Sequence, residues 1–251
     1  MPEVDGADWY FKNSLIITNR KHTMKYLKFF SVCTMLLIVN GCMSTQPLLN
    51  ESLSNFSNVY DDGEARIVNG ELQLISEKNW FFSTKEIYDD FIIEAEVKMP
   101  DTSEFSNSGI IFRGQIVESD KGSYIVGYQA EIDPSERKWT GGLFDQGRRK
   151  WLYPLHPTRS HRDEDFVTNF LGEWSKEKGD AYSHLAWNKV KIVCKGPVIK
   201  IFINGVLTTH VKDVKDSKGV IAFQHHGSKA YKERRDKSNI VRFRNITITT
   251  L

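Results

Sequence analysis

Two acidic side chains, Glu131 and Asp133, are separated by one residue within a stretch of alternating hydrophobic character. Successive side chains of a β-strand point to opposite faces, so residues two apart share a face. Gln129 precedes them at the same spacing. The pattern predicts one amide and two carboxylates in a row, a set that can transfer protons or help to hold a metal ion. A solvated strand face with paired acids is the alternative interpretation.

A histidine and an arginine extend the list of candidate catalytic residues. His226 ends an apolar segment, and its imidazole can act as an acid or a base near neutral pH. It could also join Glu131 and Asp133 as a ligand of a divalent metal, and Gln224 is expected on the same strand face. Arg113 follows an apolar run and is a fixed cation that can hold a carboxylate or donate to an anionic oxygen. A buried structural histidine and a salt bridge at the rim are the alternatives.

Amides and aromatic rings are candidates for binding a sugar. Asn107 can donate to sugar hydroxyls or cap a turn. Trp139 and Trp151 can stack on sugar rings, although tryptophan also fills the cores of β-sandwiches. The basic run Arg148–Lys150 is interpreted as a solvated loop that could border a cleft.

The elements that position these residues are predicted to be strands. Hydrophobic residues alternate with polar ones along 91–99, which is typical of a strand with one buried face. The pair Asn204-Gly205 lies between two apolar runs and predicts a hairpin turn. Only 163–178 approaches helical spacing, so one short helical segment is expected there. Ten or more short strands favour an all-β sandwich over 59–251.

Composition narrows the class of protein. The 251 residues are 40% hydrophobic and 26% charged, which argues against a disordered chain or a protein with many membrane spans. A net charge of +2 gives no electrostatic case for nucleic-acid binding. Three cysteines exclude a disulfide scaffold, and Cys194 is predicted to be a small buried hydrophobic residue.

The N-terminal part of the sequence is predicted to be a targeting signal. The apolar run 29–39 has the length of a signal-peptide core, and Lys25 and Lys28 precede it. The four residues that end at Cys42 resemble a bacterial lipobox, in which the cysteine is lipidated after cleavage. Met24 could be the true start. A plain secretory signal with an incidental cysteine is the alternative.

These observations predict three parts of the chain. Residues 1–41 are expected to form a leader and lipoprotein signal peptide, 42–58 a polar tether, and 59–251 the sandwich domain. The expected location is the cell envelope of a Gram-negative bacterium, with a lipid anchor as the only membrane attachment. Met43 gives no acidic retention signal after Cys42, which favours the outer membrane over the periplasmic face of the inner one.

Several short segments, taken in their order along the chain, resemble the 3-keto-disaccharide hydrolase family. The likeness covers about 59–251. The segments that carry it are Trp80-Phe81-Phe82-Ser83-Thr84, Asp90-Phe91-Ile92-Ile93-Glu94, 106–113 (SNSGIIFR), 127–133 (GYQAEID), 140–144 (TGGLF), Trp187-Asn188, Ile203-Asn204-Gly205-Val206, Gln224-His225-His226-Gly227 and 241–246 (VRFRNI).

The resemblance implies a concanavalin A-like jelly roll, exported and often anchored by lipid. It implies a carbohydrate substrate, a glycoside whose sugar an upstream oxidoreductase has oxidised at C3. The ketone acidifies the C2 proton, so a base can form an enolate, the C1 substituent can leave, and water can add to the glycal. Glu131, Asp133, His226 and Arg113 are the expected catalytic residues. His225 stands where the family usually has an aspartate, so that residue's role is not transferred.

Two other functions fit parts of the sequence. Glu131 and Glu136 match the spacing of the two catalytic glutamates in laminarinase-type retaining glycosidases. Residues five apart, however, lie on opposite faces of a regular strand. Pro134 also disfavours a strand that continues through Glu136. A sandwich of this class could also be a glycan-binding module without catalysis. No cofactor is firmly predicted, and a divalent metal remains one option.

Overall fold

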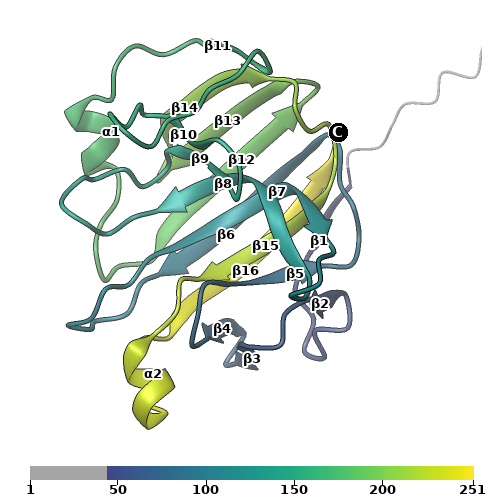
Figure 1. Ribbon diagram of the computed structural model, residues 1–251, viewed down its shortest axis with the longest axis vertical. Helices are drawn as coiled ribbons and strands as arrows, with labels where there is room; N and C mark the ends of the chain where they lie inside the picture. Colours follow the sequence, from purple (N-terminus) through teal and green to yellow (C-terminus); the bar gives the residue numbers. More distant parts are fainter. Residues whose placement is uncertain (1–43) are drawn as a thin grey trace, which may run out of the picture. The chain divides into compact units, whose positions relative to one another are not determined.

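The computed structural model describes residues 44–251, and the predicted leader, Met24 and the lipidation site Cys42 lie outside these residues. Two antiparallel sheets pack face to face (Figure 1). The larger sheet has nine strands, with neighbours in the order β11 (Phe166–Asn169), β14 (Val206–Asp213), β13 (Val198–Ile203), β12 (Asn188–Lys195), β6 (Phe91–Lys98), β16 (Val241–Thr250), β4 (Glu71–Ile75) and β3 (Glu64–Val68), while β1 (Thr45–Pro47) also pairs with β16.

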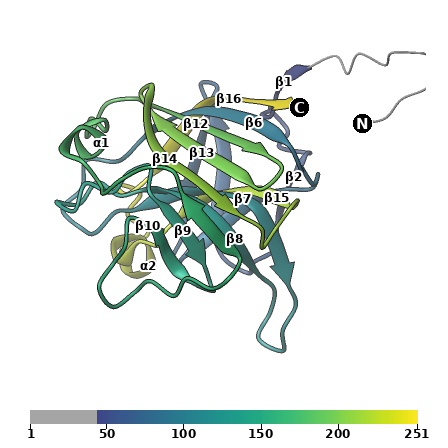
Figure 2. The ribbon, with the colours of Figure 1, turned by 90° about the horizontal axis from the view of Figure 1, so that it is seen from above.

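The second sheet carries the residues of chemical interest. Its seven strands follow the order β10 (Lys150–Tyr153), β9 (Leu143–Gln146), β8 (Tyr124–Ile132), β7 (Ser108–Val117), β15 (Val220–His225), β5 (Trp80–Thr84) and β2 (Phe56–Asn58). Figure 2 shows β12, β13 and β14 in one layer and β8, β9 and β10 in the other. The predicted all-β jelly-roll sandwich is therefore confirmed.

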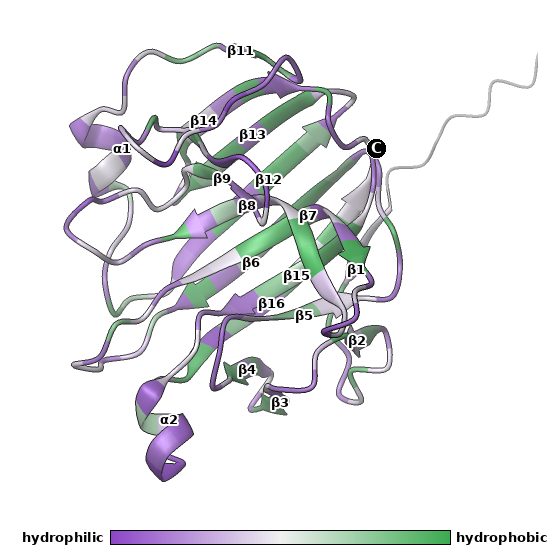
Figure 3. Cartoon of the chain, in the orientation of Figure 1, coloured by the Kyte–Doolittle hydropathy of each residue, from purple (hydrophilic) through white to green (hydrophobic). Residues whose placement is uncertain are grey.

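The core lies between the two sheets and follows the period of two. Phe91, Ile93 and Val97 of β6 are almost fully buried, and Tyr128 and Ile132 of β8 meet them from the other sheet in one cluster. Hydrophobic colour is concentrated in the strands in Figure 3, while the two helices are largely hydrophilic. Because alternate residues of β8 fill the core, the residues between them face outward.

The structure also agrees with the sequence on the Asn204-Gly205 turn and on the burial of Cys194. Asn204 and Gly205 both have positive φ, 49° and 87°, between the paired strands β13 and β14. Cys194 is fully buried in β12, and burial raises the pKa of its thiol to about 12. Both predictions from the sequence are confirmed.

The helical prediction for 163–178 is wrong over most of its length. Phe166–Asn169 is the edge strand β11, because it pairs with β14. Only its end is helical, in α1 (Lys176–Asp180), and a second short helix, α2 (Lys229–Arg234), was not predicted. Both helices are too short and polar to show a hydrophobic period, and serines cap their N-termini. No helix within 44–251 is long and apolar enough to cross a membrane.

The predicted tether 42–58 is also corrected over the part that the structure describes. Thr45–Pro47 pairs with β16, and Phe56–Asn58 pairs with β5. Leu48 and Phe56 are buried in the core between the sheets. The sandwich therefore begins close to residue 45, because its two sheets each recruit a strand from this segment.

Candidate active site

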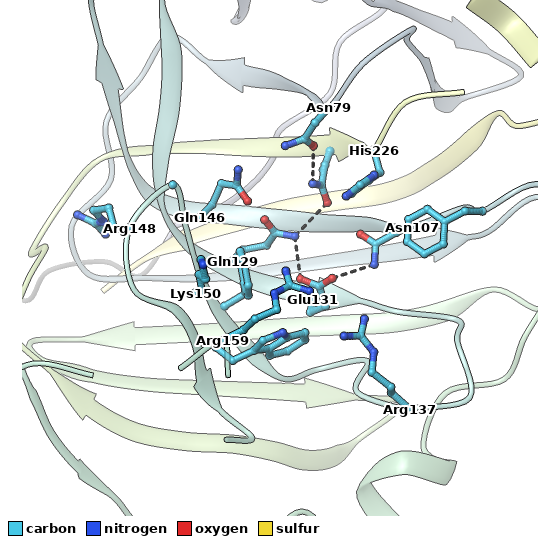
Figure 4. A pocket seen from close by; sticks show the side chains of 15 residues that line it. Asn79, Asn107, Gln129, Glu131, Arg137, Gln146, Arg148, Lys150, Arg159 and His226 are labelled. Atoms are coloured by element: carbon cyan, nitrogen blue, oxygen red, sulfur yellow. Dashed lines mark hydrogen bonds between the residues drawn. The ribbon is translucent and has the colours of Figure 1, made fainter. Parts of the chain in front are cut away.

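A pocket of about 570 Å³ opens on the outer face of the seven-stranded sheet (Figure 4). Most of its walls come from the ends of β8, β9, β10 and β15 and from the loops that join them. The lining residues are Asn79, Phe105, Asn107, Gln129, Glu131, Arg137, Phe144, Gln146, Gly147, Arg148, Lys150, Trp151, Arg159, Gln224 and His226. The pocket thus unites six of the predicted site residues, namely Asn107, Gln129, Glu131, Trp151, Gln224 and His226.

Glu131 is the one carboxylate among the lining residues, and it is 6% exposed. One carboxylate oxygen accepts a hydrogen bond of 2.8 Å from Asn107 Nδ2, and the other accepts one of 3.0 Å from Gln129 Nε2. Burial raises the pKa of Glu131 to about 7, although the Asn107 hydrogen bond opposes that rise. Glu131 can therefore accept or release a proton close to neutral pH.

A chain of amides fixes the orientation of the Glu131 site. Gln129 Nε2 also donates to Gln224 Oε1 at 2.9 Å, and Gln224 Nε2 donates to Asn79 Oδ1 at 2.7 Å (Figure 4). The Gln129 amide nitrogen thus donates both to Glu131 and to Gln224, which sets the orientation of its side chain. Gln129 Oε1 and Trp151 Nε1 are buried and find no hydrogen-bond partner among residues 44–251. A buried polar atom without a partner is costly, so these two atoms mark positions where a ligand can bond.

The Gln129 side chain has room beside Glu131 because residue 109 is a glycine. Gly109 lies directly opposite Glu131 in the β7–β8 ladder. A Cβ atom at this position would lie only 2.4 Å from Gln129 Nε2. The amide that holds Glu131 therefore depends on the missing side chain across the ladder.

His226 lies directly after β15, beyond the other end of the amide chain. Its ring is exposed and packs edge to face on Phe105, with centroids 5.2 Å apart. Desolvation by the neighbouring protein lowers the pKa of His226, which favours the neutral imidazole. The ring can accept a proton or polarise a bound water.

His225 points away from the pocket, as expected for adjacent strand residues. Its Nε2 lies 2.8 Å from the Asn239 carbonyl, and its Nδ1 accepts from Gly227 N at 3.1 Å. Burial lowers the pKa of His225 to about 4, which keeps the ring neutral. This histidine therefore fixes the turn that carries His226 through neutral hydrogen bonds.

Four cationic side chains line the pocket opposite its one acid. Arg137 pairs with Asp133 at 2.9 Å, and Arg148 pairs with Asp145 at 2.8 Å. Lys150 and Arg159, by contrast, have no carboxylate within 4.0 Å in the part of the chain that the structure describes. The basic run Arg148–Lys150 is therefore not a solvated loop throughout. Arg148 and Lys150 line the pocket, whereas Arg149 is buried and pairs with aspartates.

Asp133 does not share the Glu131 site, contrary to the prediction. β8 ends at Ile132, and the Asp133 amide donates to Thr140 Oγ1 at 2.9 Å, so the alternation of a strand stops there. Its carboxylate pairs with Arg137 and lines a separate cavity that also contains Glu136. The pairing of Glu131 with Glu136 required for a retaining glycosidase is therefore not formed.

The proposed metal ligands do not converge either. Glu131 and His226 line the pocket, whereas Asp133 lies outside it. Within residues 44–251, no three His, Cys, Asp or Glu side chains are grouped in a way that could hold a metal ion. The three candidate ligands of a divalent metal therefore do not form a metal site in the described residues.

Arg113 has a structural place outside the pocket, so its predicted catalytic role is corrected. It lies where the β7–β8 register shifts, with a φ of 50°. Its guanidinium donates to the Asp89 carbonyl at 2.8 and 3.0 Å and to the Asp216 carbonyl at 3.2 Å, and it pairs with Asp90 at 3.1 Å. These contacts tie two loops to β7, and Arg113 is not among the residues that line the pocket.

Trp139 is placed beside the pocket rather than in its wall. Its ring meets Trp151 edge to face, with centroids 4.8 Å apart, and it lines a neighbouring cavity. The sequence prediction missed several lining residues, among them Asn79, Phe105 and Arg159. These residues lie in loops, where no period of hydrophobicity indicates which way a side chain points.

The chain matches one known protein family over almost all of the residues that the structure describes. A family described as 3-keto-alpha-glucoside-1,2-lyase-like domain matches residues 44–249, which include every residue of the pocket. No curated protein matches the chain.

Solved structures with a similar fold are distant in sequence. A protein of Parabacteroides distasonis proposed to be a glycosyl hydrolase is 17% identical, with a TM-score of 0.49 over 83% of this chain and 100% of that one. The carbohydrate-binding module CBM66 of Bacillus subtilis is 13% identical, with a TM-score of 0.45 over 78% of this chain and 96% of that one. A B. subtilis protein of unknown function with a galectin-like fold is 14% identical, with a TM-score of 0.44 over 82% of this chain and 96% of that one.

Proposed function

This chain belongs to the 3-keto-alpha-glucoside-1,2-lyase-like family, and on that premise we propose that it cleaves glycosides whose sugar is oxidised at C3. Family membership supports a carbohydrate-active function in general. The observation that carries the specific proposal is Glu131, a buried carboxylate with a pKa of about 7 at the wall of a pocket rich in hydrogen-bond donors. A C2 proton beside a ketone needs a base of this kind.

Glu131 is proposed to start the elimination. Its carboxylate takes the C2 proton, and the electron pair of the C–H bond moves toward the C3 oxygen as an enolate. The enolate then re-forms the ketone while the C1–O bond breaks, which leaves a 3-keto glycal with a C1–C2 double bond. The protonated Glu131 returns its proton to the departing oxygen on the neighbouring carbon. The charges of Arg137 and Arg159 lower the pKa of Glu131, and the same positive potential favours the enolate.

His226 is proposed to act in the second step. Its neutral imidazole can take a proton from a water molecule while the oxygen of that water bonds to C1 of the glycal. The proton then returns to C2, so the sum of both steps is hydrolysis to the 3-keto sugar and the alcohol. Glu131 and His226 thus serve separate steps from separate walls of the pocket.

The first test compares a C3-oxidised glucoside with its unoxidised parent. We expect cleavage of the oxidised glucoside only, and Glu131→Gln is expected to lower kcat by about 10²–10⁴, the usual contribution of a general base. Glu136→Gln is the matched control and should keep its activity. Cleavage of the parent glucoside, with loss in both variants, would favour a retaining glycosidase. Binding of both glycosides without cleavage of either would favour a glycan-binding module.

The pH dependence follows from the raised pKa of Glu131. A base must be ionised to act, so kcat/KM is expected to rise with pH and to level off above about 7. The measurement is a pH–rate profile on the oxidised glucoside, with circular dichroism as a check that the fold persists. A profile that is already level at pH 5 would contradict the role given to Glu131.

Replacement of His226 is expected to separate the two steps. His226→Gln should still eliminate the C1 substituent but should hydrate the glycal at least tenfold more slowly, because the variant lacks the base for water. Nuclear magnetic resonance of the reaction mixture would detect the accumulating glycal. Equal loss of alcohol release and hydration would show that His226 belongs to the elimination instead.

We also propose an envelope location for the protein. The substrate requires an upstream oxidoreductase that forms the C3 ketone, and Cys42 is the predicted attachment point of a lipid anchor. Mass spectrometry of the mature protein is expected to show a lipidated Cys42 at its N-terminus, and Cys42→Ala should abolish membrane recovery. An unmodified N-terminus at another residue would contradict the anchor.

A further inference from the structure

The pocket is lined by more positive than negative side chains. Its four cations face a single carboxylate whose pKa of about 7 leaves it partly neutral at neutral pH. Arg137 and Arg148 have aspartate partners, whereas Lys150 and Arg159 have none within 4.0 Å among the described residues. Charges of one sign along a concave wall attract a ligand of the opposite sign.

The backbone holds Lys150 and Arg159 together on the wall of β10. Trp151 N donates to the Arg159 carbonyl at 2.9 Å, and His161 N donates to the Arg149 carbonyl at 3.0 Å, so the loop runs along β10 as an added edge. Lys150 has a φ of 62°, an uncommon conformation for a residue with a side chain. The two free cations are therefore placed by main-chain pairing.

Lys150 and Glu131 line the same pocket from strands that are not adjacent. β10 is two strands from β8, and adjacent strands are about 4.8 Å apart, so their backbones are separated by about 10 Å. Lys150 of β10 pairs with Asp145 of β9, and Asp145 pairs with Tyr128 of β8. Tyr128 precedes Glu131 by three residues. A sugar whose C2 proton meets Glu131 can extend another of its groups toward this wall.

Arg159 connects that wall with the reaction centre. Figure 4 shows Lys150 on the opposite side of Glu131 from His226, with the Arg159 side chain running back toward Glu131. The Arg159 charge lowers the pKa of both Glu131 and His226. Nearby, Trp151 Nε1 is a buried donor without a partner. This side of the pocket thus offers a lysine and an arginine, both of which donate hydrogen bonds.

We propose that the pocket selects an anionic glycoside, one that carries a carboxylate or sulfate group held by Lys150 and Arg159. This inference rests on the proposed function for the orientation of the sugar. The charged group lies either on the leaving group or on C6 of the oxidised sugar. Both placements put a negative charge several bonds away from C2, toward the wall that carries Lys150 and Arg159.

Two matched pairs of C3-oxidised substrates test the proposal. The first pair has 3-carboxyphenyl and 3-carbamoylphenyl leaving groups, and the second has a C6 carboxylate and a C6 alcohol. We expect kcat/KM to favour the anionic member of one pair by about tenfold or more, the effect of one charge-assisted hydrogen bond. In Lys150→Met/Arg159→Met the preference should fall to near unity, while Lys195→Met, an exposed lysine of the other sheet, should retain it. Added salt should also weaken the preference.

Affinity provides a measurement that does not need turnover. Calorimetric titration of Glu131→Gln with the same four glycosides is expected to give tighter binding of the anionic member, and the added double substitution should remove the difference. Tighter anionic binding without any cleavage would support the anionic site and reject the proposed reaction. Equal affinity and equal rates within both pairs would overturn the anionic site. Equal loss of rate on neutral and anionic substrates in the double variant would assign the cations to the enolate alone.

Discussion

The site depends on keeping one carboxylate buried and ready to accept a proton. Burial of Glu131 disfavours its ionised form, the Asn107 hydrogen bond offsets part of that cost, and Gln129 holds the other carboxylate oxygen. With fewer donors the acid would stay protonated at neutral pH, and with several closer cations it would be a weak base. The amide pair thus sets both the position and the basicity of the carboxylate.

The sandwich separates stability from chemistry by the alternation of its strands. In β8, Tyr128 and Ile132 pack in the core between the sheets, while Gln129 and Glu131 face the pocket on the other side. The core can therefore be filled with hydrophobic side chains without placing one in the site. The pocket face also restricts the neighbouring strand. The Gln129 amide occupies the space that a side chain at position 109 would fill, so this position needs glycine.

Arginines of the seven-stranded sheet and its loops serve two different purposes. Arg113 and Arg149 are buried, and main-chain carbonyls and aspartates saturate them, so they join loops to the sandwich. Arg159 is exposed and has no such partner among the described residues, which leaves its charge for the pocket. All three residues carry the same guanidinium group, so the partners around each group decide whether it is structural or available to a ligand.

The sequence by itself determined the regular strands such as β6, β12 and β13, the Asn204-Gly205 turn, and the shared strand faces of Gln129 with Glu131 and of Gln224 with His226, because each follows from a local period or a turn preference. It also identified His226 and Asn107 as residues of the site. Only the tertiary structure decided that Asp133 and Arg113 leave the pocket and that Lys150 and Arg159 enter it. Those outcomes depend on where a strand ends and on which distant carboxylates and carbonyls lie nearby. Neither condition is encoded in the spacing of neighbouring residues.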